Sequence, residues 1–409
     1  MSAPHRALAA AVGLLALGCS QDLQSPGVTE QPAGLVTAAA APLAYRQLSA
    51  GYYHTCGVTT TNAAYCWGRN DTDQLGAGVL GDQGRPVAVR GGLKFLQLSA
   101  GAGYTCGITT TNLAYCWGEN GVGQLGDGTT TRRLIPRLVA GGRKYRQIRS
   151  GYFHTCAITL ADVAFCWGRN SNGQVGDGTT TPRLVPTRVK TTATFRWVFA
   201  AGLHSCGATT DFHALCWGRN EDGQLGDGTT LKKVVPTAIA GSRAFRVVTV
   251  GAFKGNGDGW NAASCGITTA DQTFCWGDNT YGGLGDGTTT KRLTPSPVTG
   301  GHSFSTVSVA PGHACALAFD ASAWCWGTNG NGELGIGLLG GAYPDPLPVI
   351  GGVHFKTITA GTIYTCGVAT DDRAYCWGAN QFGQLGVGSI NTGGLFVPHF
   401  QPTAVVGPA

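Results

Sequence analysis

The sequence predicts an all-β protein, a seven-bladed β-propeller with about four strands in each blade. The first observation is a motif, Cys-x9-Cys-Trp-Gly-x-Asn, that occurs seven times without a gap, with a period of about 50 residues. The second is composition: glycine makes up 66 of 409 residues and charged residues 12%, a profile that suits short strands joined by tight turns. One four-stranded unit buries little apolar surface alone, so we expect the repeats to close into a ring, in preference to an open solenoid or separate beads.

Each repeat divides into four strand-like segments. In the first repeat, the segment 45–51 is a short run that ends in glycine, and we expect it to form the first strand. The segments 53–59 and 63–68 are rich in β-branched and aromatic residues and flank an Asn-containing turn, which is typical of a hairpin. The fourth strand is expected at 136–141 and 236–241 in later repeats, where proline opens the strand and need not donate to the ladder. The repeats begin near residues 45, 95, 145, 195, 245, 304 and 355.

The N-terminal segment predicts export. Residues 1–18 have a basic start and an apolar run that is too short to span a bilayer, which indicates a signal peptide. The sequence Ala-Leu-Gly-Cys that ends at Cys19 resembles a bacterial lipobox, so we expect cleavage before Cys19 and lipidation of this cysteine; an ordinary cleaved signal is the alternative. Residues 19–42 predict a flexible tether and residues 43–409 the propeller. The lipid would anchor the protein at the cell envelope, on the outer membrane or cell surface of a Gram-negative cell; otherwise the protein is secreted.

The repeats carry two cysteines each, and with Cys19 the chain contains 15. In a hairpin centred on Thr61, Cys56 falls opposite Cys66, and directly opposed residues have Cβ atoms about 4.5–5.5 Å apart, close to disulfide range. Export to an oxidising compartment and an even count without Cys19 also favour pairing, with buried thiol pairs as the alternative. A zinc site is disfavoured because each pair would need two further ligands. The predicted disulfides are Cys56–Cys66, Cys106–Cys116, Cys156–Cys166, Cys206–Cys216, Cys265–Cys275, Cys315–Cys325 and Cys366–Cys376.

A histidine and a tryptophan recur beside the cysteines. The histidine precedes the first cysteine by two residues in four repeats, as in His54, and we expect it to cap the glycine turn by hydrogen bonding, not to bind a metal. The tryptophan follows the second cysteine in every repeat, as in Trp67, which favours packing between blades over an aromatic binding ladder. No metal or cofactor is expected. Gly-x-Gly-x-x-Gly matches at 121–126 and 330–335 belong to the repeated turn and lack the strand-to-helix context of a dinucleotide site.

The repeat resembles that of the regulator of chromosome condensation (RCC1) family of seven-bladed propellers. The resemblance is carried by Gly-x-x-His-Thr at 51–55, Trp-Gly-x-Asn at 67–70 and Gly-Gln-Leu-Gly at 123–126, and it extends from residue 45 to about 407. The cysteine pair is more similar to an exported bacterial branch of the superfamily, which includes propellers of the β-lactamase-inhibitory protein II type. How the ring closes is left open: residues 32–36 echo a fourth strand, yet residues 402–407 already complete the seventh repeat.

Binding residues are expected where the repeats differ, because insertions in a repeat scaffold map to loops on one face. Repeats two to five share a Gly-Asp-Gly-Thr-Thr phrase followed by basic residues, which form either a positive arc or a solvated charged loop. Repeats one, six and seven, neighbours in a closed ring, have more apolar loops at 77–86, 336–346 and 387–398. Repeat five carries an insertion at 252–264, for which we expect ligand contact, with calcium binding as an alternative. The candidate partner-binding residues are Leu338, Leu339, Tyr343, Leu395, Phe396, Lys254 and Trp260.

These observations predict a non-enzymatic interaction scaffold that binds a protein or glycan, is held at the membrane by its N-terminal lipid and acts as a monomer. The net charge of +6 is modest for this length and gives no reason to expect nucleic-acid binding. No nucleophile elbow, His-Glu-x-x-His motif or recognisable carboxylate pair indicates catalysis, although a hydrolase or lyase site in the channel stays an alternative. The family resemblance implies two further alternatives: guanine-nucleotide exchange, and inhibition of an envelope or secreted hydrolase such as a β-lactamase.

Overall fold

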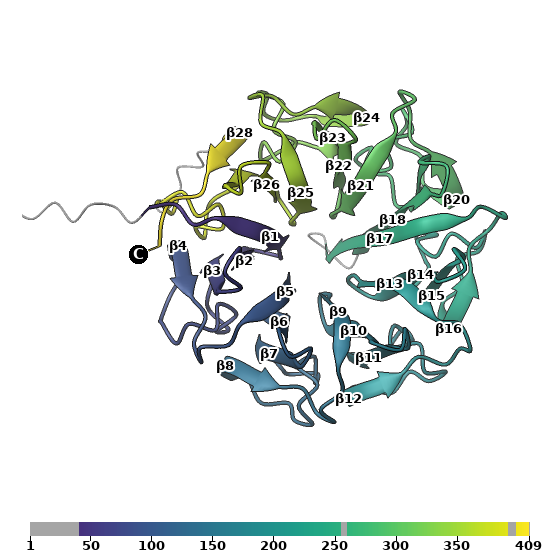
Figure 1. Ribbon diagram of the computed structural model, residues 1–409. Coiled ribbons are helices and arrows are strands. Elements are labelled where there is room, and N and C mark those ends of the chain that lie inside the picture. The colour runs from purple at the N-terminus through teal and green to yellow at the C-terminus, as the bar shows by residue number, and fades with distance from the viewer. Residues whose placement is uncertain (1–40, 255–259, 392–397, 409) are drawn as a thin grey trace, which may run out of the picture. The chain divides into compact units, whose positions relative to one another are not determined.

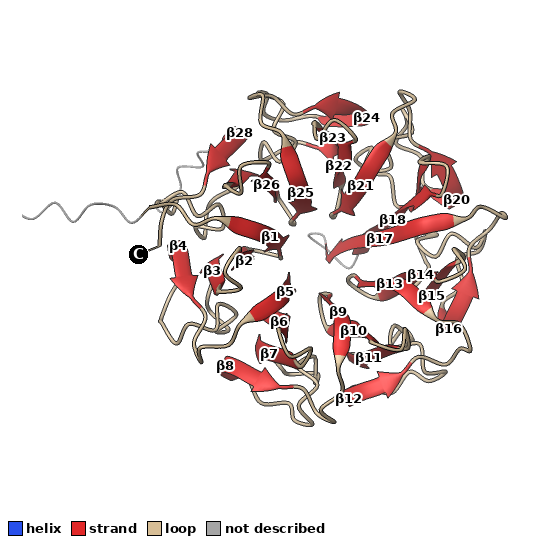
Figure 2. Cartoon of the chain, viewed as in Figure 1, coloured by secondary structure: helices blue, strands red, loops and turns tan. Residues whose placement is uncertain are grey.

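The computed structural model describes residues 41–254, 260–391 and 398–408. These residues form seven four-stranded antiparallel sheets arranged around a central axis as the blades of a propeller (Figure 1). The described ranges consist of strands and loops without a helix (Figure 2), which confirms the predicted all-β propeller with four strands in each blade. A helix long and apolar enough to cross a membrane is likewise absent from these ranges.

Every blade has its strands in chain order, from the axis to the rim. The inner strands are β1 (Tyr45–Ala50), β5 (Phe95–Ala100), β9 (Tyr145–Ser150), β13 (Phe195–Ala200), β17 (Phe245–Lys254), β21 (Phe304–Val309) and β25 (Phe355–Ala360). The second strands are β2 (His54–Thr59), β6 (Tyr104–Thr109), β10 (His154–Thr159), β14 (His204–Thr209), β18 (Trp260–Thr268), β22 (His313–Ala318) and β26 (Tyr364–Ala369). The third strands are β3 (Ala64–Gly68), β7 (Ala114–Gly118), β11 (Ala164–Gly168), β15 (Ala214–Gly218), β19 (Thr273–Gly277), β23 (Ala323–Thr328) and β27 (Ala374–Gly378). The outer strands are β4 (Gln83–Ala88), β8 (Arg133–Leu138), β12 (Arg183–Arg188), β16 (Lys233–Ala238), β20 (Arg292–Pro297), β24 (Ala342–Pro348) and β28 (His399–Ala404).

The second and third strands form the predicted tight hairpin. In the first blade, Cys56 pairs directly with Cys66, and the turn between β2 and β3 contains Asn62 with a φ of 64°. Asparagine and aspartate tolerate this left-handed conformation better than most residues, which explains why they occupy the turn in most of the repeats. The left-handed residue of this turn, which is Phe212 in the fourth blade and Ala321 in the sixth, accompanies the register that brings the two cysteines together in every blade.

The outer strand begins earlier than the sequence predicts. In the second blade, β8 starts at Arg133, so Pro136 lies inside the strand and does not open it. The ladder between β7 and β8 shifts register at this point, with Cys116 opposite Arg137 and Gly118 opposite Arg133. Proline is tolerated here because β8 is an edge strand and the shift leaves this part of it out of the regular ladder.

The ring closes without exchange of strands between blades among the described residues. The first sheet contains β1 to β4 and the seventh contains β25 to β28, so each blade comes from one continuous repeat. Side chains join these two blades: the Tyr364 hydroxyl donates to the His54 carbonyl at 2.7 Å, and the Thr55 hydroxyl donates to the Gln384 carbonyl at 2.8 Å. Residues 32–36, which suggested another mode of closure, lie outside the described residues.

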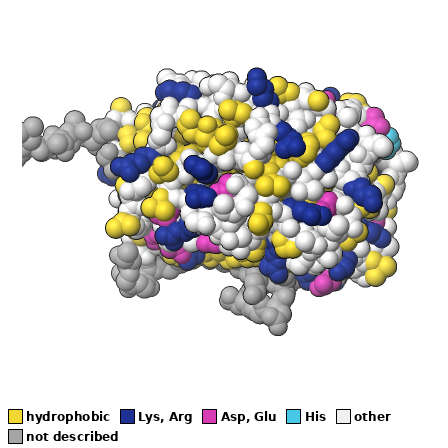
Figure 3. Space-filling model, turned by 90° about the horizontal axis from the view of Figure 1, so that it is seen from below, with side chains coloured by type: hydrophobic (Ala, Val, Ile, Leu, Met, Phe, Trp, Pro, Cys, Tyr) yellow, Lys and Arg dark blue, Asp and Glu magenta, His cyan; other side chains and the backbone are white. Residues whose placement is uncertain are grey.

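The hydrophobic core is divided among the seams between neighbouring blades. One cluster combines Cys56 and Leu75 of the first blade with Phe95 and Trp117 of the second, and all four side chains are fully buried. At the outer side of the ring, apolar and basic side chains are interspersed (Figure 3). The exposed apolar residues there include Leu134 and Ile135 of β8. The fold is therefore held mainly between blades, and each blade needs its neighbours to bury its apolar faces.

The two ends of the ring differ in the lengths of their connections. In an antiparallel sheet, the turn after the first strand and the loop after the third strand leave at the same end. In the first blade these are residues 51–53 and 69–82, and we call the end that carries them and their counterparts the loop face. The opposite end, called the turn face, carries the turn at 60–63 and the connection at 89–94.

Candidate functional site

The repeated cysteines are interior staples. The structure contains the seven predicted disulfides, each joining paired residues of a hairpin with Cα atoms 4.0 to 4.1 Å apart. All fourteen cysteines are fully buried. Sulfurs that are both paired and enclosed offer neither a thiolate nucleophile nor a metal ligand, so the cysteines belong to the scaffold.

The repeated tryptophans are also scaffold residues. The Trp67 indole donates its N–H to the Gln384 carbonyl of the preceding blade at 2.9 Å, and Trp217 does the same to the Gln174 carbonyl at 2.9 Å. A Cβ on Gly386, which has a φ of +69°, would lie 2.7 Å from Trp67 Nε1, so only glycine fits at this point. This confirms the prediction that the tryptophans pack between blades.

The prediction for the repeated histidine is wrong. The ring of His54 does not cap its own glycine turn, since Nε2 lies 2.8 Å from the hydroxyl of Thr105 in the next blade. His154 contacts the Ser205 hydroxyl in the same way at 2.8 Å. Burial lowers the pKa of both imidazoles to about 3, so they are neutral at physiological pH. The seam geometry decides this role, because the hydroxyl partner lies one repeat further along the chain.

The basic residues of the loop face are largely neutralised. Arg133 pairs with Asp127, and Arg183 with Asp177, within the Gly-Asp-Gly-Thr-Thr loops. Burial alone would raise the pKa of these two carboxyls, but hydrogen bonds from the threonine hydroxyls and from the arginines hold it below its usual value. Arg132, at the neighbouring position, pairs with Asp73 of the first blade. These loops are solvated ion-paired turns, not a continuous positive arc.

The predicted apolar anchors differ in how exposed they are. Leu338 and Leu339 are exposed, at 54% and 52% of their surface, in the loop between β23 and β24. Tyr343 is half-buried and packs against the core cluster at the seam of blades six and seven, which leaves less of its ring available to a partner. Leu395 and Phe396 lie outside the described residues.

Exposed apolar side chains are not confined to blades one, six and seven. Leu80, in the loop between β3 and β4, is 94% exposed; it belongs to the apolar loop 77–86 but is not among the predicted anchors. Leu231 and Tyr281 are exposed in the corresponding loops of the fourth and fifth blades. The loop face as a whole, and not one sector of it, presents these side chains.

The insertion of the fifth repeat lengthens one hairpin. The strands β17 and β18 have 10 and 9 residues, and Lys254 pairs with Trp260 at the end of their ladder. Because this hairpin is the connection between the first and second strands, its extension projects on the loop face. Residues 255–259 between these strands are outside the described residues.

Two aromatic–cation clusters on the loop face escaped the sequence analysis. Tyr53 of the first blade lies 4.8 Å from the ring of Phe382 in the seventh, and the guanidinium of Arg69 lies 5.1 Å from the Phe382 ring centroid. In the third blade, Arg169 lies 5.3 Å from the ring centroid of Phe153. A cation placed over an aromatic ring is attracted by the negative face of the ring, and this attraction holds both side chains in position.

A sequence signal for these clusters exists at the two positions before the histidine. Repeats one and three have Tyr-Tyr and Tyr-Phe there, whereas repeat two has Ala102 and Gly103. The small residues leave space over the second blade, and the rings of Tyr52 and Tyr152 meet across it at 5.4 Å. A contact that skips one blade cannot be read from the repeat pattern alone.

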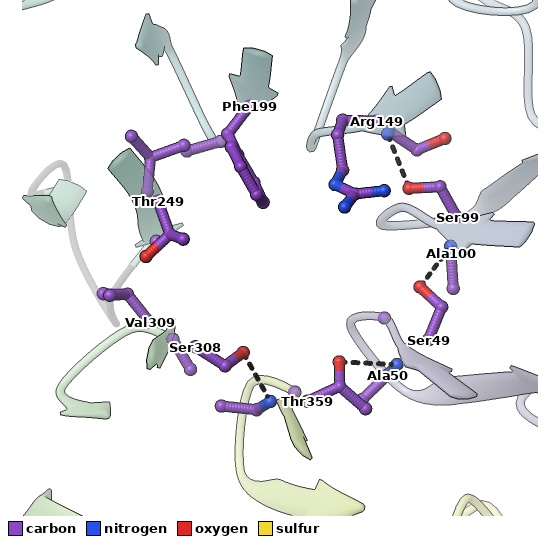
Figure 4. A pocket seen from close by; sticks show the side chains of 18 of the residues that line it. Ser49, Ala50, Ser99, Ala100, Arg149, Phe199, Thr249, Ser308, Val309 and Thr359 are labelled. Atoms are coloured by element: carbon purple, nitrogen blue, oxygen red, sulfur yellow. Dashed lines mark hydrogen bonds between the residues drawn. The ribbon is translucent and has the colours of Figure 1, made fainter. Parts of the chain in front are cut away.

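The inner strands of all seven blades enclose a channel with a cavity of about 590 Å³ (Figure 4). Its wall is mixed: alanine, valine and hydroxyl side chains predominate, and the charged residues among the described lining are basic. Arg149 and Phe199 extend into this space from β9 and β13. No cluster of three His, Cys, Asp or Glu side chains suited to a metal ion occurs in the part of the chain that the structure describes.

Comparison with known proteins identifies the repeat. A family model described as the regulator of chromosome condensation (RCC1) repeat matches residues 62–108, 112–158, 162–208, 213–252, 271–318 and 371–409. A second model of the same description matches residues 45–74, 95–124, 145–174 and 355–384. Together they cover residues 45–208, 213–252, 271–318 and 355–409, so Cys265 of the fifth blade and Cys325 of the sixth are the repeated cysteines outside the matched ranges.

Two curated relatives match part of the chain. The chain is 31% identical over 126 residues to the ultraviolet-B receptor UVR8 of Arabidopsis thaliana, a match that covers 30% of this chain and 29% of that protein. It is 29% identical over 132 residues to the probable E3 ubiquitin-protein ligase HERC4 of Homo sapiens, covering 31% and 12% of the two chains. The matches therefore span less than a third of each relative.

Solved structures match over most of the ring. Prp20p from Saccharomyces cerevisiae superimposes with a TM-score of 0.72 at 18% identity, covering 89% of this chain and 87% of that one. Human WBSCR16 superimposes with a TM-score of 0.68 at 21% identity, covering 77% and 84%. Likeness at this level of identity establishes the fold.

Proposed function

This chain belongs to the regulator of chromosome condensation repeat family, and from that premise we propose that it is a non-enzymatic scaffold that captures a protein partner on the loop face of its propeller. One observation carries the proposal. The residues that repeat are enclosed in the seams, whereas the residues that do not repeat, including Leu80, Leu338 and Leu339, are exposed at this face. Exposed leucines on the same face as aromatic–cation clusters suit the apolar centre and polar surround of a protein interface.

The proposed compartment is the cell envelope. Seven disulfides are consistent with an exported or extracellular protein, since thiols are kept reduced in the cytosol. Within this setting we place the lipid anchor on Cys19, by the lipobox-like sequence that precedes it. Mass spectrometry of the N-terminal peptide from the native membrane fraction tests this proposal. We expect an acylated Cys19 as the first residue.

Partner capture tests the proposal directly. A bait with Cys19→Ser, which removes the anchor, is immobilised and incubated with the envelope fraction of its own cell. The variant Leu80→Ser/Leu338→Ser/Leu339→Ser should retain at least tenfold less of the captured protein than the unaltered bait, because buried apolar anchors dominate the affinity of interfaces.

A matched control removes exposed apolar side chains from the opposite end. Leu160 and Phe319 are exposed in turns between second and third strands, so they lie on the turn face. The variant Leu160→Ser/Phe319→Ser should bind as the unaltered bait does. Equal capture by all three baits, or loss only in the control variant, contradicts the assignment to the loop face, and capture that a glycosidase abolishes shows that the partner is a glycan.

A further inference from the structure

One position of the inner strand, occupied by Ser49 in the first blade, forms a ring of seven side chains around the channel. Five blades have a hydroxyl side chain at this position and two do not. The blades contribute, in order, Ser49, Ser99, Arg149, Phe199, Thr249, Ser308 and Thr359. Five of these side chains carry a hydroxyl group. The third and fourth blades replace it with a guanidinium and a phenyl ring, and these two side chains face each other with the Arg149 guanidinium carbon 4.7 Å from the Phe199 ring centroid (Figure 4).

The hydroxyls of this ring satisfy backbone groups of the next blade. The Ser49 hydroxyl accepts from the Ala100 N–H at 3.0 Å, and the Ser99 hydroxyl accepts from the Ser150 N–H at 2.8 Å. In the third blade the corresponding pair is the Arg149 side chain and the Ala200 N–H. A guanidinium has no acceptor atom, so Arg149 cannot accept from this N–H as the repeated hydroxyls do. Its guanidinium instead donates to the Ile148 carbonyl at 3.2 Å.

A second polar group of the ring lacks a partner. The Thr249 hydroxyl is buried and makes no hydrogen bond, and the residue is 4% exposed. A buried hydroxyl without a partner costs free energy, so its presence beside an open cavity favours an external partner. Thr249 lies next to Phe199 in the ring order (Figure 4).

Arg149 is a charge without a counterion among the described residues. The lining residues include no aspartate or glutamate in the described ranges. The lining contains three other cations: Arg246 and Lys356 pair with Asp271 and Asp372 outside the cavity wall, and the guanidinium carbon of Arg196 lies 4.9 Å from the ring centroid of Phe212. Burial lowers the pKa of Arg149 to about 10, so the group still carries its charge at neutral pH.

We propose that the channel binds the carboxylate of a small organic acid, held by the Arg149 guanidinium between the third and fourth blades. The planar fork of arginine matches the two oxygens of a carboxylate, and a single monocation suits a monoanion better than a phosphate or sulfate dianion. The cavity of about 590 Å³ is in the range of small-molecule sites. Its alanine and valine wall would contact the uncharged part of the acid. The carboxylate site does not use Leu80, Leu338 or Leu339, on which the proposed partner capture rests.

Isothermal titration calorimetry of the oxidised chain with Cys19→Ser tests the proposal, using acetate, benzoate and glucuronate as probes and benzamide as the uncharged match to benzoate. At least one of the three carboxylates should bind saturably, and benzamide should not. Arg149→Ser, which installs the side chain of the first and second blades, should weaken that binding at least tenfold. Phe199→Leu, which keeps the apolar volume but frees the guanidinium, should weaken it by less.

The control variant removes the same charge elsewhere. Arg132→Ser deletes an exposed arginine of the loop face and should leave carboxylate binding within twofold of the unaltered chain. If Arg149→Ser unfolds at the same temperature as the unaltered chain, its loss of binding does not reflect a loss of folding. The proposal is overturned if none of the three carboxylates binds, if Arg149→Ser binds them as well as the unaltered chain, or if sulfate binds more tightly than they do.

Discussion

The seams between the blades and the ring that lines the channel are built from the same repeated strands, yet they vary in opposite ways. The disulfide-bonded cysteines and the tryptophan of the seam are identical in all seven repeats. The ring position that holds Ser49 in the first blade holds arginine in the third and phenylalanine in the fourth. Seam side chains are enclosed at close packing, where a change of volume is costly, whereas ring side chains border open space. Repetition thus marks packing, and variation marks surfaces that a ligand can reach.

The largest expected effect comes from two tryptophans of the fourth blade. Trp217 is fully buried in a seam, and Trp197 is 36% exposed at the channel. Trp217→Ala should lower the free energy of unfolding by about 3–5 kcal/mol, because it leaves a cavity in the seam and removes one of the two hydrogen bonds that the Gln174 carbonyl accepts. Trp197→Ala should change it by less than about 1 kcal/mol. Urea unfolding of both variants measures the difference, and equal losses would break the distinction between seam and channel.

Removal of one disulfide is the next largest change. Cys206→Ala/Cys216→Ala should lower the free energy of unfolding by about 3 kcal/mol, because the unfolded chain regains the freedom of a short closed loop. The channel lies away from this buried pair, so the carboxylate affinity should not change. Urea unfolding measures the stability, and the unaltered chain treated with reductant is the control, since it should lose at least as much. A variant as stable as the unaltered chain would show that the staple is redundant.

The seam between the sixth and seventh blades departs from the pattern, and we expect it to make the stability of the protein depend on pH. Glu333 replaces the glutamine of the Gly-Gln-Leu-Gly motif, is fully buried and has one carboxyl oxygen without a partner. At the same seam the Trp377 indole N–H also lacks a partner. Burial raises the pKa of Glu333 to about 7, so the folded state favours the protonated acid. The contribution of Glu333 to the free energy of unfolding is therefore most favourable below the ordinary pKa of 4.5, and it is lost as pH rises from there to about 7.

Glu333→Gln tests this seam by restoring the residue of most other blades. The variant should match the unaltered chain below pH 4.5 and exceed it above pH 7, by at most roughly 3 kcal/mol. Free energies of unfolding from urea titrations at pH 4 to 8 measure the gap. Asp127→Asn, which alters a carboxyl whose pKa is lowered, serves as a control because it should not reproduce this rise with pH. A constant gap across the range would contradict ionisation of Glu333 as the cause.

The smallest expected effects compare two positions of the channel ring. Ser99→Ala removes the acceptor of the Ser150 N–H and should lower the free energy of unfolding by about 1 kcal/mol. Arg149→Ser introduces a hydroxyl where the repeat normally has one and should leave the stability within about 0.5 kcal/mol of its original value. Thermal unfolding at one pH and salt concentration compares them. A loss in Arg149→Ser as large as that in Ser99→Ala would indicate that Arg149 holds the fold and is not a site for a ligand.

The sequence was sufficient for features that depend on short separations. The spacing of Cys56 and Cys66 around an asparagine turn predicts both the hairpin and its disulfide, and the structure contains them. The position of Pro136 misled the prediction of the outer strand, because an edge strand with a register shift accepts proline inside it. Lipidation at Cys19 and contacts of Leu395 and Phe396 stay predictions, since these residues lie outside the described ranges.

The candidate sites could be predicted only in part, since they are formed by residues of different repeats. His54 was assigned to its own turn, but its hydroxyl partner is Thr105 of the next blade. Leu338 and Leu339 were found because they stand in a loop that departs from the repeat. The Arg149–Phe199 contact was missed, although both residues break the pattern of hydroxyls in the first strand. An alignment of the seven inner strands by itself shows the exceptions but not that they face each other.

The sequence by itself determined the number of blades, the strands within each, the disulfide pairing and the burial of the tryptophans, because each follows from a pattern of residues within one repeat. Only the tertiary structure decided how the ring closes and which side chains meet across it. Tyr53 meets Phe382 from the opposite end of the chain, and Tyr52 meets Tyr152 over a whole blade. Such contacts depend on the curvature of seven packed sheets, which no single repeat specifies, and the proposed sites in the channel and on the loop face depend on that curvature in the same way.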